Sequence, residues 1–288
     1  MTKAVRICIV MSVIICLTIT CLWLGLESDL AIIDIANLRN SHPGLRFELD
    51  QRSNVVTVLV DDKTDFDAIG NLDFDYQINI QGLIFENDEW GKVVKDNLVG
   101  VHLVGCEFPG NIFDFSSSKL RRIALDRCNA RTHIIYNGTS VTDLLVTEMT
   151  YTSVRELLDN GCKSAREIRL TAIESESPLT IEIGAFVQVL QISAMKHAIC
   201  NFAFVDETQD LSLVELYDLT ISTGDVIKFL SRKRLSILHL DDCAIVRDSS
   251  GYAQNALDCT PKIVVRLTDD NFTLLGEILA GHCQITRL

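Results

Sequence analysis

Few residues of this chain favour disorder, and no common catalytic or cofactor motif is present. The 288 residues include 4 Pro and 15 Gly, and no low-complexity tract occurs, so the chain is expected to be ordered beyond its ends. The sequence has no nucleophile elbow, zinc-protease helix, Walker loop or dinucleotide-binding glycine motif. It also has no Cys-x-x-Cys pair, which argues against a zinc site. We therefore predict a protein that is not an enzyme and that binds no cofactor and no metal.

Positive charge is scarce as well. The formal net charge is -13, from 26 Lys and Arg against 39 Asp and Glu. An acidic protein repels the phosphate backbone of nucleic acids. We therefore expect no nucleic-acid partner, and a protein partner is the better candidate.

The N-terminus carries one long apolar run. Residues 7–26 contain no charged side chain, Lys3 and Arg6 precede them, and Glu27 and Asp29 follow. Twenty apolar residues can span a bilayer as a helix, and the positive flank is expected to stay in the cytoplasm. This pattern predicts a single-pass membrane anchor at residues 1–26 with the rest of the chain extracytoplasmic. A cleaved signal, which would release a secreted protein, and a lipidated start are the alternatives.

A short pattern of two apolar residues separated by one variable residue returns through most of the chain. Successive units begin 18 to 27 positions apart, and two apolar residues at this spacing share one face of a strand. A fixed period of this size predicts stacked structural repeats, about 10–11 of them over residues 56–288. The pairs are Val56/Val58, Ile78/Ile80, Val101/Leu103, Ile123/Leu125, Leu144/Val146, Ile168/Leu170, Leu190/Ile192, Val214/Leu216, Leu238/Leu240, Val265/Leu267 and Cys283/Ile285.

Several units extend this pattern to a longer consensus. The clearest are Leu98-x-x-Val101-x-Leu103-x-x-Cys106-x-Phe108 and Leu235-x-x-Leu238-x-Leu240-x-x-Cys243-x-Ile245. This pattern resembles the leucine-rich repeat family, whose unit is L-x-x-L-x-L-x-x-N/C-x-L. The resemblance implies an α/β fold: a curved leucine-rich repeat solenoid with parallel strands on its concave face and helices or turns on its convex face, here with an N-terminal transmembrane helix. The family's Asn/Cys site is irregular in this chain, which predicts uneven curvature.

The segments between the pairs predict three helices and one cap. Helical spacing covers residues 152–161, 224–231 and 271–280, and Ser153 with Glu156 fits a capping box. Residues 27–55 are expected to form a juxtamembrane segment and an N-terminal cap, in which residues 45–49 pair with residues 55–60.

Most cysteines beyond the apolar run fall at apolar repeat positions. Cys106, Cys128, Cys243 and Cys283 are of this kind, and buried thiols behave as small hydrophobic groups. They are expected to pack in the core. If the body is extracytoplasmic, Cys243 and Cys259 are the first pair to check for a disulfide.

The residues that alternate with the core pairs should line the concave sheet, where the leucine-rich repeat family usually binds protein. We expect Glu215, His239 and Arg266 to be consecutive across three strands, with Tyr217 and Asp241 beside them, because adjacent strands lie about 4.8 Å apart. An aromatic ring among charges is typical of binding hot spots. The alternative is an ordinary solvated strand face whose charges pair with each other. The candidate binding residues are Arg169, Glu215, Tyr217, His239, Asp241 and Arg266.

The predicted function is therefore that of a membrane-anchored, extracytoplasmic, non-catalytic recognition module that binds a protein. The first alternative is a structural or assembly scaffold of a membrane complex, which an exposed apolar patch on the outer helices would favour. An enzyme would require His239 and Asp241 to converge with a Ser or Cys in one pocket.

Overall fold

The computed structural model describes most of the chain after residue 35, in two compact units. The boundary between the units falls between Leu59 and Val60. The described residues are 36–288 except 38, 41–44, 51–54, 71, 73, 87–88, 109–112, 115–118, 131–133, 136–140, 177, 205–209, 249–260 and 280–282.

The first unit contains a β-hairpin. Strand β1 (Arg46–Asp50) pairs antiparallel with β2 (Val55–Val60), with Phe47 opposite Val58. Side chains alternate along β2 between buried and half-buried, as expected for a strand with one apolar face. The pairing predicted for residues 45–49 and 55–60 is therefore present.

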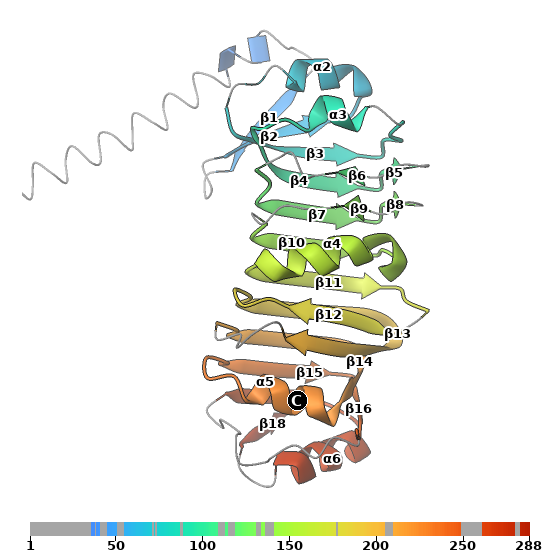
Figure 1. Cartoon of the computed structure of the whole chain (residues 1–288), viewed down its shortest axis with the longest axis vertical. Coiled ribbons are helices and arrows are strands. Elements are labelled where there is room, and N and C mark those ends of the chain that lie inside the picture. Colours follow the sequence, from blue (N-terminus) through green and yellow to red (C-terminus); the bar gives the residue numbers. More distant parts are fainter. Residues whose placement is uncertain are drawn as a thin grey trace, which may run out of the picture. The chain divides into compact units, whose positions relative to one another are not determined.

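The second unit is built on a long parallel sheet. Figure 1 shows its main strands stacked in chain order, from β3 to the C-terminal strands. The order of hydrogen-bonded neighbours is β3 (Tyr76–Gln81), β4 (Leu98–Val104), β7 (Arg122–Asp126), β10 (Asp143–Thr147), β11 (Glu167–Ile173), β13 (Val189–Phe204), β14 (Leu213–Ser222), β15 (Ile237–Asp241), β17 (Lys262–Arg266) and β18 (Ile285–Arg287).

The repeated apolar pairs set the register of this sheet from β3 to β15. Each pair lies opposite the next, from Ile78 opposite Val101 to Leu216 opposite Leu240. The side chains of these pairs are almost completely buried, since none of them exposes more than 2% of its surface. The apolar pattern thus places one continuous core on one face of the sheet.

The predicted register fails by two residues at β17. Leu240 lies opposite Val265 and Leu238 opposite Ile263, so the core pair is Ile263/Val265 and not Val265/Leu267. The predicted pair Cys283/Ile285 is shifted too, because Ile285 of β18 lies opposite Ile263 and Arg287 lies opposite Val265. Because Ile263, Val265 and Leu267 are apolar at alternate positions, a shift of two residues keeps the apolar side chains on the same face.

A left-handed residue follows the main strands at a repeated position. Gly82, Gly105, Arg127, Glu148, Ala172, Asp218 and Asp242 all have φ between 49° and 65°. The peptide N–H of this residue commonly donates to the last carbonyl of the next strand, as from Gly105 to Asp126 at 2.8 Å and from Asp242 to Arg266 at 2.8 Å. This turn ends β3, β4, β7, β10 and β15, whereas β11 and β14 continue past their left-handed residues, Ala172 and Asp218.

Several connecting segments are strands and not helices, and this finding corrects the predicted fold class. Two segments alternate with period 2, which favours strand over helix: β12 (Leu179–Ile183), which pairs with the second half of β13, and β16 (Ala244–Val246), which pairs with the second half of β14. Smaller parallel pairs are β5 (Glu107–Phe108) with β8 (Asn129–Ala130), and β6 (Phe113–Asp114) with β9 (Ile134–Ile135).

Helices are few in the described part of the chain. The longer ones are α4 (Tyr151–Ser164), α5 (Thr223–Leu230) and α6 (Asp269–Leu279), at the three places where helical spacing was predicted. Shorter ones include the single turns α2 (Phe66–Ile69) and α3 (Trp90–Val93) and the 3-10 turn η1 (Lys63–Asp65), and residues 36–37 and 39–40 are helical as well. The prediction of a leucine-rich repeat solenoid with helices along its convex face is therefore wrong: the architecture is a large, mixed β-sheet with few helices.

The predicted ends of α4 are also wrong. The helix begins at Tyr151, so Ser153 lies inside it and not at its N-cap, and it continues past Gly161 to Ser164. The Ser153 hydroxyl instead lies 2.6 Å from the hydroxyl of Thr150.

The structure does not support the predicted transmembrane helix or the localisation derived from it. Among the described residues, no helix is long and apolar enough to cross a membrane. The predicted span, residues 7–26, lies outside the described residues. The fold class with a transmembrane helix and the single-pass topology with an extracytoplasmic body are therefore withdrawn.

Helix α5 shows how a connecting helix is fixed against the sheet. Its N-cap Ser222 accepts a hydrogen bond from the N–H of Asp225 at 3.0 Å. The Phe229 ring packs edge-on against Phe202 of β13, with ring centroids 4.9 Å apart. The buried carboxylate of Asp225 is balanced by Lys228, whose Nζ lies 2.8 Å away. The helix therefore covers the core with its apolar side and neutralises its only buried acid.

Candidate functional site

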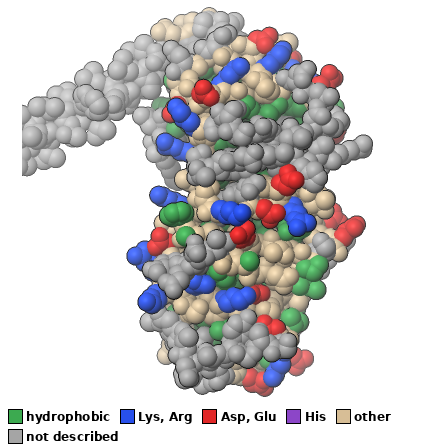
Figure 2. Space-filling view, in the orientation of Figure 1, with side chains coloured by type: hydrophobic (Ala, Val, Ile, Leu, Met, Phe, Trp, Pro, Cys, Tyr) green, Lys and Arg blue, Asp and Glu red, His purple; other side chains and the backbone are tan. Residues whose placement is uncertain are grey.

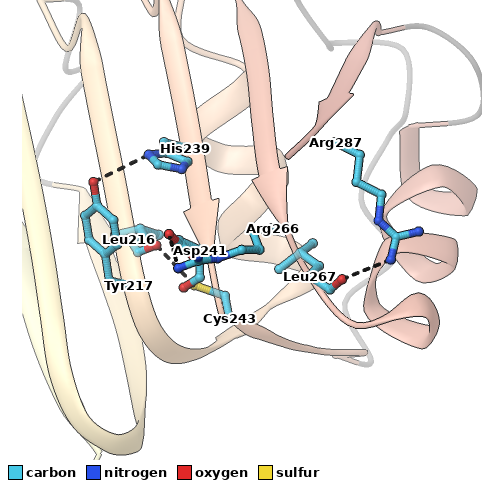
Figure 3. A network of polar contacts seen from close by, with 8 residues as sticks. All are labelled: Leu216, Tyr217, His239, Asp241, Cys243, Arg266, Leu267 and Arg287. Atoms are coloured by element: carbon cyan, nitrogen blue, oxygen red, sulfur yellow. Dashed lines mark hydrogen bonds and ion pairs between the residues drawn. The ribbon is translucent and has the colours of Figure 1, made fainter.

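Five of the six predicted binding residues lie on three adjacent strands. Strand β14 carries Glu215 and Tyr217, β15 carries His239 and Asp241, and β17 carries Arg266. These positions alternate with buried core residues, so their side chains lie on the face opposite the core. Figure 3 shows four of them together with their neighbours.

The register places these residues in two rows. Glu215 lies opposite His239, and Tyr217 lies opposite Asp241, as predicted. Arg266, however, lies opposite Asp241, and Val264 takes the position opposite His239. The predicted row of Glu215, His239 and Arg266 is therefore wrong at its third member, because of the two-residue shift in β17.

Tyr217 and His239 contact each other diagonally across β14 and β15. The Tyr217 hydroxyl lies 3.4 Å from Nδ1 of His239, and the two rings meet edge-on with centroids 5.4 Å apart. Diagonal neighbours of this kind are within reach of aromatic side chains. Desolvation raises the pKa of Tyr217 above its usual value, and the nearby carboxylates of Glu215 and Asp241 raise it further. The phenol is therefore neutral near neutral pH and can donate a hydrogen bond.

One ring nitrogen of His239 is unsatisfied within the part of the chain that the structure describes. Its Nε2 is buried and makes no hydrogen bond with any residue that the structure describes. Buried polar atoms are normally hydrogen-bonded. Because this nitrogen is shielded from solvent, it is an unsatisfied polar atom and not a contact point for another molecule.

Arg266 donates two hydrogen bonds to the carboxylate of Asp241. Its Nε lies 2.6 Å from Oδ1 and its Nη2 lies 2.9 Å from Oδ2 of the carboxylate. The Asp241 side chain is 13% exposed and that of Arg266 is 64% exposed. The hydrogen bonds with Asp241 raise the pKa of Arg266, and Asp242 and Asp218 contribute through their charge. Asp241 therefore holds the Arg266 guanidinium in one orientation, while most of the Arg266 side chain stays exposed to solvent.

Arg169 belongs to the same row as Glu215 but not to the cluster. It lies opposite Gln191 of β13, which in turn lies opposite Glu215, so one strand separates the two. Its guanidinium pairs with Glu167 of its own strand. Arg169 could therefore reach only the edge of a ligand centred on Tyr217.

Two acids beside the cluster were not among the predicted site residues. Asp218 and Asp242 are the left-handed residues that directly follow Tyr217 and Asp241. The spacing of Gly82 and Gly105 after their strands could have indicated this position, because glycine favours left-handed turns. The predicted pattern considered only the strand face and omitted these turns.

Cys243 lies behind the cluster, on the core side. Its thiol donates to the carbonyl of Leu216 at 3.3 Å, as Figure 3 shows. Burial raises the pKa of Cys243 to about 11. The thiol is therefore protonated near neutral pH and acts as a structural bridge between repeats.

The cluster offers recognition chemistry. It presents an aromatic ring, an exposed guanidinium and several carboxylates on a rigid sheet, and its ionisable aromatic group is held in the neutral form. No group of three or more His, Cys, Asp or Glu suited to a metal ion was found in the described residues. A scan against protein-family models and searches of curated proteins and solved structures returned no match. The leucine-rich repeat resemblance therefore stays a prediction from the repeat pattern.

Proposed function

We propose that this protein is a non-catalytic binding module that recognises a protein through the face formed by β14, β15 and β17. The binding surface is defined as Glu215, Tyr217, His239, Asp241 and Arg266. The observation that carries this proposal is the pairing of Tyr217 with His239 beside the Asp241–Arg266 ion pair. Tyr and Arg are enriched at the centres of protein interfaces.

Preorganisation supports the same proposal. The guanidinium of Arg266 is held in one orientation by both carboxylate oxygens of Asp241. The Tyr217 ring is fixed by its edge contact with His239. Side chains that are already ordered lose less entropy when a partner binds. The Arg266 guanidinium and the Tyr217 ring can therefore contact a partner with little rearrangement.

The charge distribution favours a protein over a polyanion. Acidic and basic side chains are interspersed over the described part of the side shown in Figure 2, which carries α4 and α5, and on the binding surface Asp241 pairs with Arg266. The net charge of -13 adds a general repulsion toward nucleic acid. A protein surface with its own mixed charges can complement this pattern.

The scaffold alternative gains less support. Large apolar side chains that are exposed in the described part of the chain are Ile84, Phe186, Ile199, Ile237, Val246 and Leu288. None of these described residues lies in a helix, so the outer helices do not supply the apolar patch that the scaffold hypothesis requires.

The test compares partner capture by matched variants. Tagged wild-type protein, Tyr217→Ala and Arg266→Ala are used in quantitative affinity purification from the native source, with Arg247→Ala as the control. The Arg247 side chain is 71% exposed and lies on another segment, where it pairs with Glu277. We expect Tyr217→Ala and Arg266→Ala to lose the same partner and Arg247→Ala to keep it. Equal capture by all four proteins would contradict the proposed surface.

A further inference from the structure

Two buried cysteines lie side by side on consecutive turns of the sheet. Val104 lies opposite Asp126 before them, and Glu107 lies opposite Asn129 after them. Cys106 is two residues after Val104 and one before Glu107, and Cys128 has the same separations from Asp126 and Asn129. The two cysteines therefore also lie opposite each other. Neighbouring strands are about 4.8 Å apart, which is within the Cα separation of about 4.4–6.8 Å that a disulfide spans.

Backbone hydrogen bonds fix the two cysteines on both sides. The N–H of Gly105 donates to the carbonyl of Asp126 at 2.8 Å, and the N–H of Asn129 donates to the carbonyl of Cys106 at 2.9 Å. The two thiols point into the same core, because Cys106 and Cys128 are 0% and 6% exposed. A bond between them would therefore need no large movement of the backbone.

The Cys128 thiol is directed toward the repeat of Cys106, because it donates to the carbonyl of Leu103 at 3.4 Å. The Cys106 thiol donates to the carbonyl of Ile80 on β3 at 3.5 Å, so a rotation about its Cα–Cβ bond is needed to turn its sulfur toward Cys128. A hydrogen bond between the two thiols lowers the pKa of Cys106 and raises that of Cys128. The difference favours Cys106 as the thiol that ionises first.

We propose that Cys106 and Cys128 form a dithiol site that a small peroxide oxidises to an intrachain disulfide. One thiolate attacks an oxygen of the peroxide, the O–O bond breaks, and a sulfenic acid and water result. The second thiolate attacks the sulfenic sulfur, the S–O bond breaks, and a second water leaves. In total, two thiols lose two hydrogens and one hydrogen peroxide becomes two waters. The product links β4 to β7 through the turns that follow them.

Cys243 provides an internal control. It occupies the equivalent repeat position and also donates its thiol to the preceding strand. By continuation of the register from Tyr217 opposite Asp241, its neighbour is Leu219, which has no thiol. Cys243 should stay reduced because no thiol occupies the register position beside it, although the buried thiol of Cys200 is close enough to interact with it electrostatically.

Peptide mapping tests the site in the full-length protein. Folded protein is treated with hydrogen peroxide, remaining thiols are alkylated in denaturant, and a non-reducing tryptic digest is analysed by mass spectrometry. We expect residues 96–119 linked to residues 128–131, while residues 235–247 carry alkylated Cys243. In the Cys106→Ser variant, the linked species should be absent and Cys128 should be recovered as the alkylated thiol or a higher oxide.

A stability measurement gives a second readout. Oxidised wild-type protein should unfold at a Tm about 5 °C or more above that of the reduced protein, because a closed loop restricts the unfolded chain. Reductant should reverse the rise, and Cys106→Ser should show none. Recovery of Cys106 and Cys128 unlinked after peroxide treatment, or Cys243 linked in their place, would overturn the proposal.

Discussion

Arg266 lies directly opposite Asp241, on the neighbouring strand, and both oxygens of the carboxylate accept hydrogen bonds from its guanidinium. The ion pair is half in solvent, since Arg266 is 64% exposed and Asp241 is 13% exposed. Exposed ion pairs contribute little to folding because water and salt screen them. This arrangement suits a group that orients Arg266 for contact with another molecule.

We therefore expect Arg266→Ala to change binding far more than stability. The dissociation constant for the partner should rise by about tenfold or more, as for truncation of a hot-spot side chain. The Tm should stay close to that of the wild type, because the pair is exposed. Calorimetric titration and thermal unfolding measure the two effects. A large fall in Tm with unchanged affinity would assign the pair to folding.

Leu216 and Glu215 are neighbours on β14 with opposite roles. Leu216 is completely buried in the core, whereas Glu215 lies on the binding surface. Leu216→Asp should destabilise the fold by about 4 kcal/mol or more, because it removes a core side chain and buries a charge. Glu215→Lys should leave the free energy of unfolding within about 0.5 kcal/mol.

Urea denaturation of the two variants checks this contrast. If Glu215→Lys unfolded the protein and Leu216→Asp did not, the assignment of the two faces of the sheet would be reversed. The matched pair is informative because the substitutions are adjacent and each leaves a charged side chain that was not there before.

Much of the sheet was predictable from the sequence, and β17 shows where prediction stopped. Most of the pairs from Ile78/Ile80 to Leu238/Leu240 are followed two positions later by a glycine or a charged residue, which disfavours a shift of two residues. In β17 the run Ile263, Val265, Leu267 offers two registers with the same apolar face. Both registers make equivalent backbone hydrogen bonds, so contacts with the rest of the chain decide between them, and that information is not local.

The helical content was overestimated because the expected helices came from the resemblance and not from the local spacing of residues. The resemblance to a known repeat implied helices between the strands, but Leu179–Ile183 and the second half of β13 alternate with period 2 and form a second line of parallel pairing. Where the local spacing was helical, at residues 152–161, 224–231 and 271–280, helices are present. The spacing of the residues was a better guide than the resemblance.

The left-handed turns predict opposite effects of glycine at two equivalent positions. Gly105 has φ of 58°, and Ala172 has φ of 52° at the same place in its repeat. A Cβ costs roughly 1–2 kcal/mol in this conformation. Gly105→Ala should therefore lower the free energy of unfolding by about 1 kcal/mol. Ala172→Gly should raise it by up to about 1 kcal/mol, because the relief of strain exceeds the added entropy of the unfolded chain.

Chemical denaturation measures both changes. Among the described residues, no heavy atom beyond the two adjacent residues lies within 4 Å of a Cβ built on Gly105, so a steric clash does not confuse the result. Destabilisation by both substitutions would show that the φ of this position does not control its stability.

Tyr76 makes the fold sensitive to alkaline pH. Its side chain is completely buried and its hydroxyl donates to the carbonyl of Val93 at 3.1 Å. Burial raises the pKa of Tyr76 from 10.0 to about 12. The unfolded chain therefore releases this proton at lower pH than the folded protein, so its contribution to stability is complete below pH 10 and is lost as the pH rises toward 12.

The loss should approach about 1.4 kcal/mol per pH unit for this one group within that window. Urea unfolding at pH 9 to 12 measures the slope, and Tyr76→Phe is the matched control because it keeps the ring and removes the titrating hydroxyl. Subtracting the two pH profiles cancels the contributions of Lys, Cys and the other tyrosines. The variant should be less stable than the wild type at pH 9, because it lacks the hydrogen bond to Val93, and the difference should shrink as the pH rises. A constant difference across the range would mean that the Tyr76 hydroxyl titrates alike in the folded and unfolded states, and the burial of its oxygen would then not control its pKa.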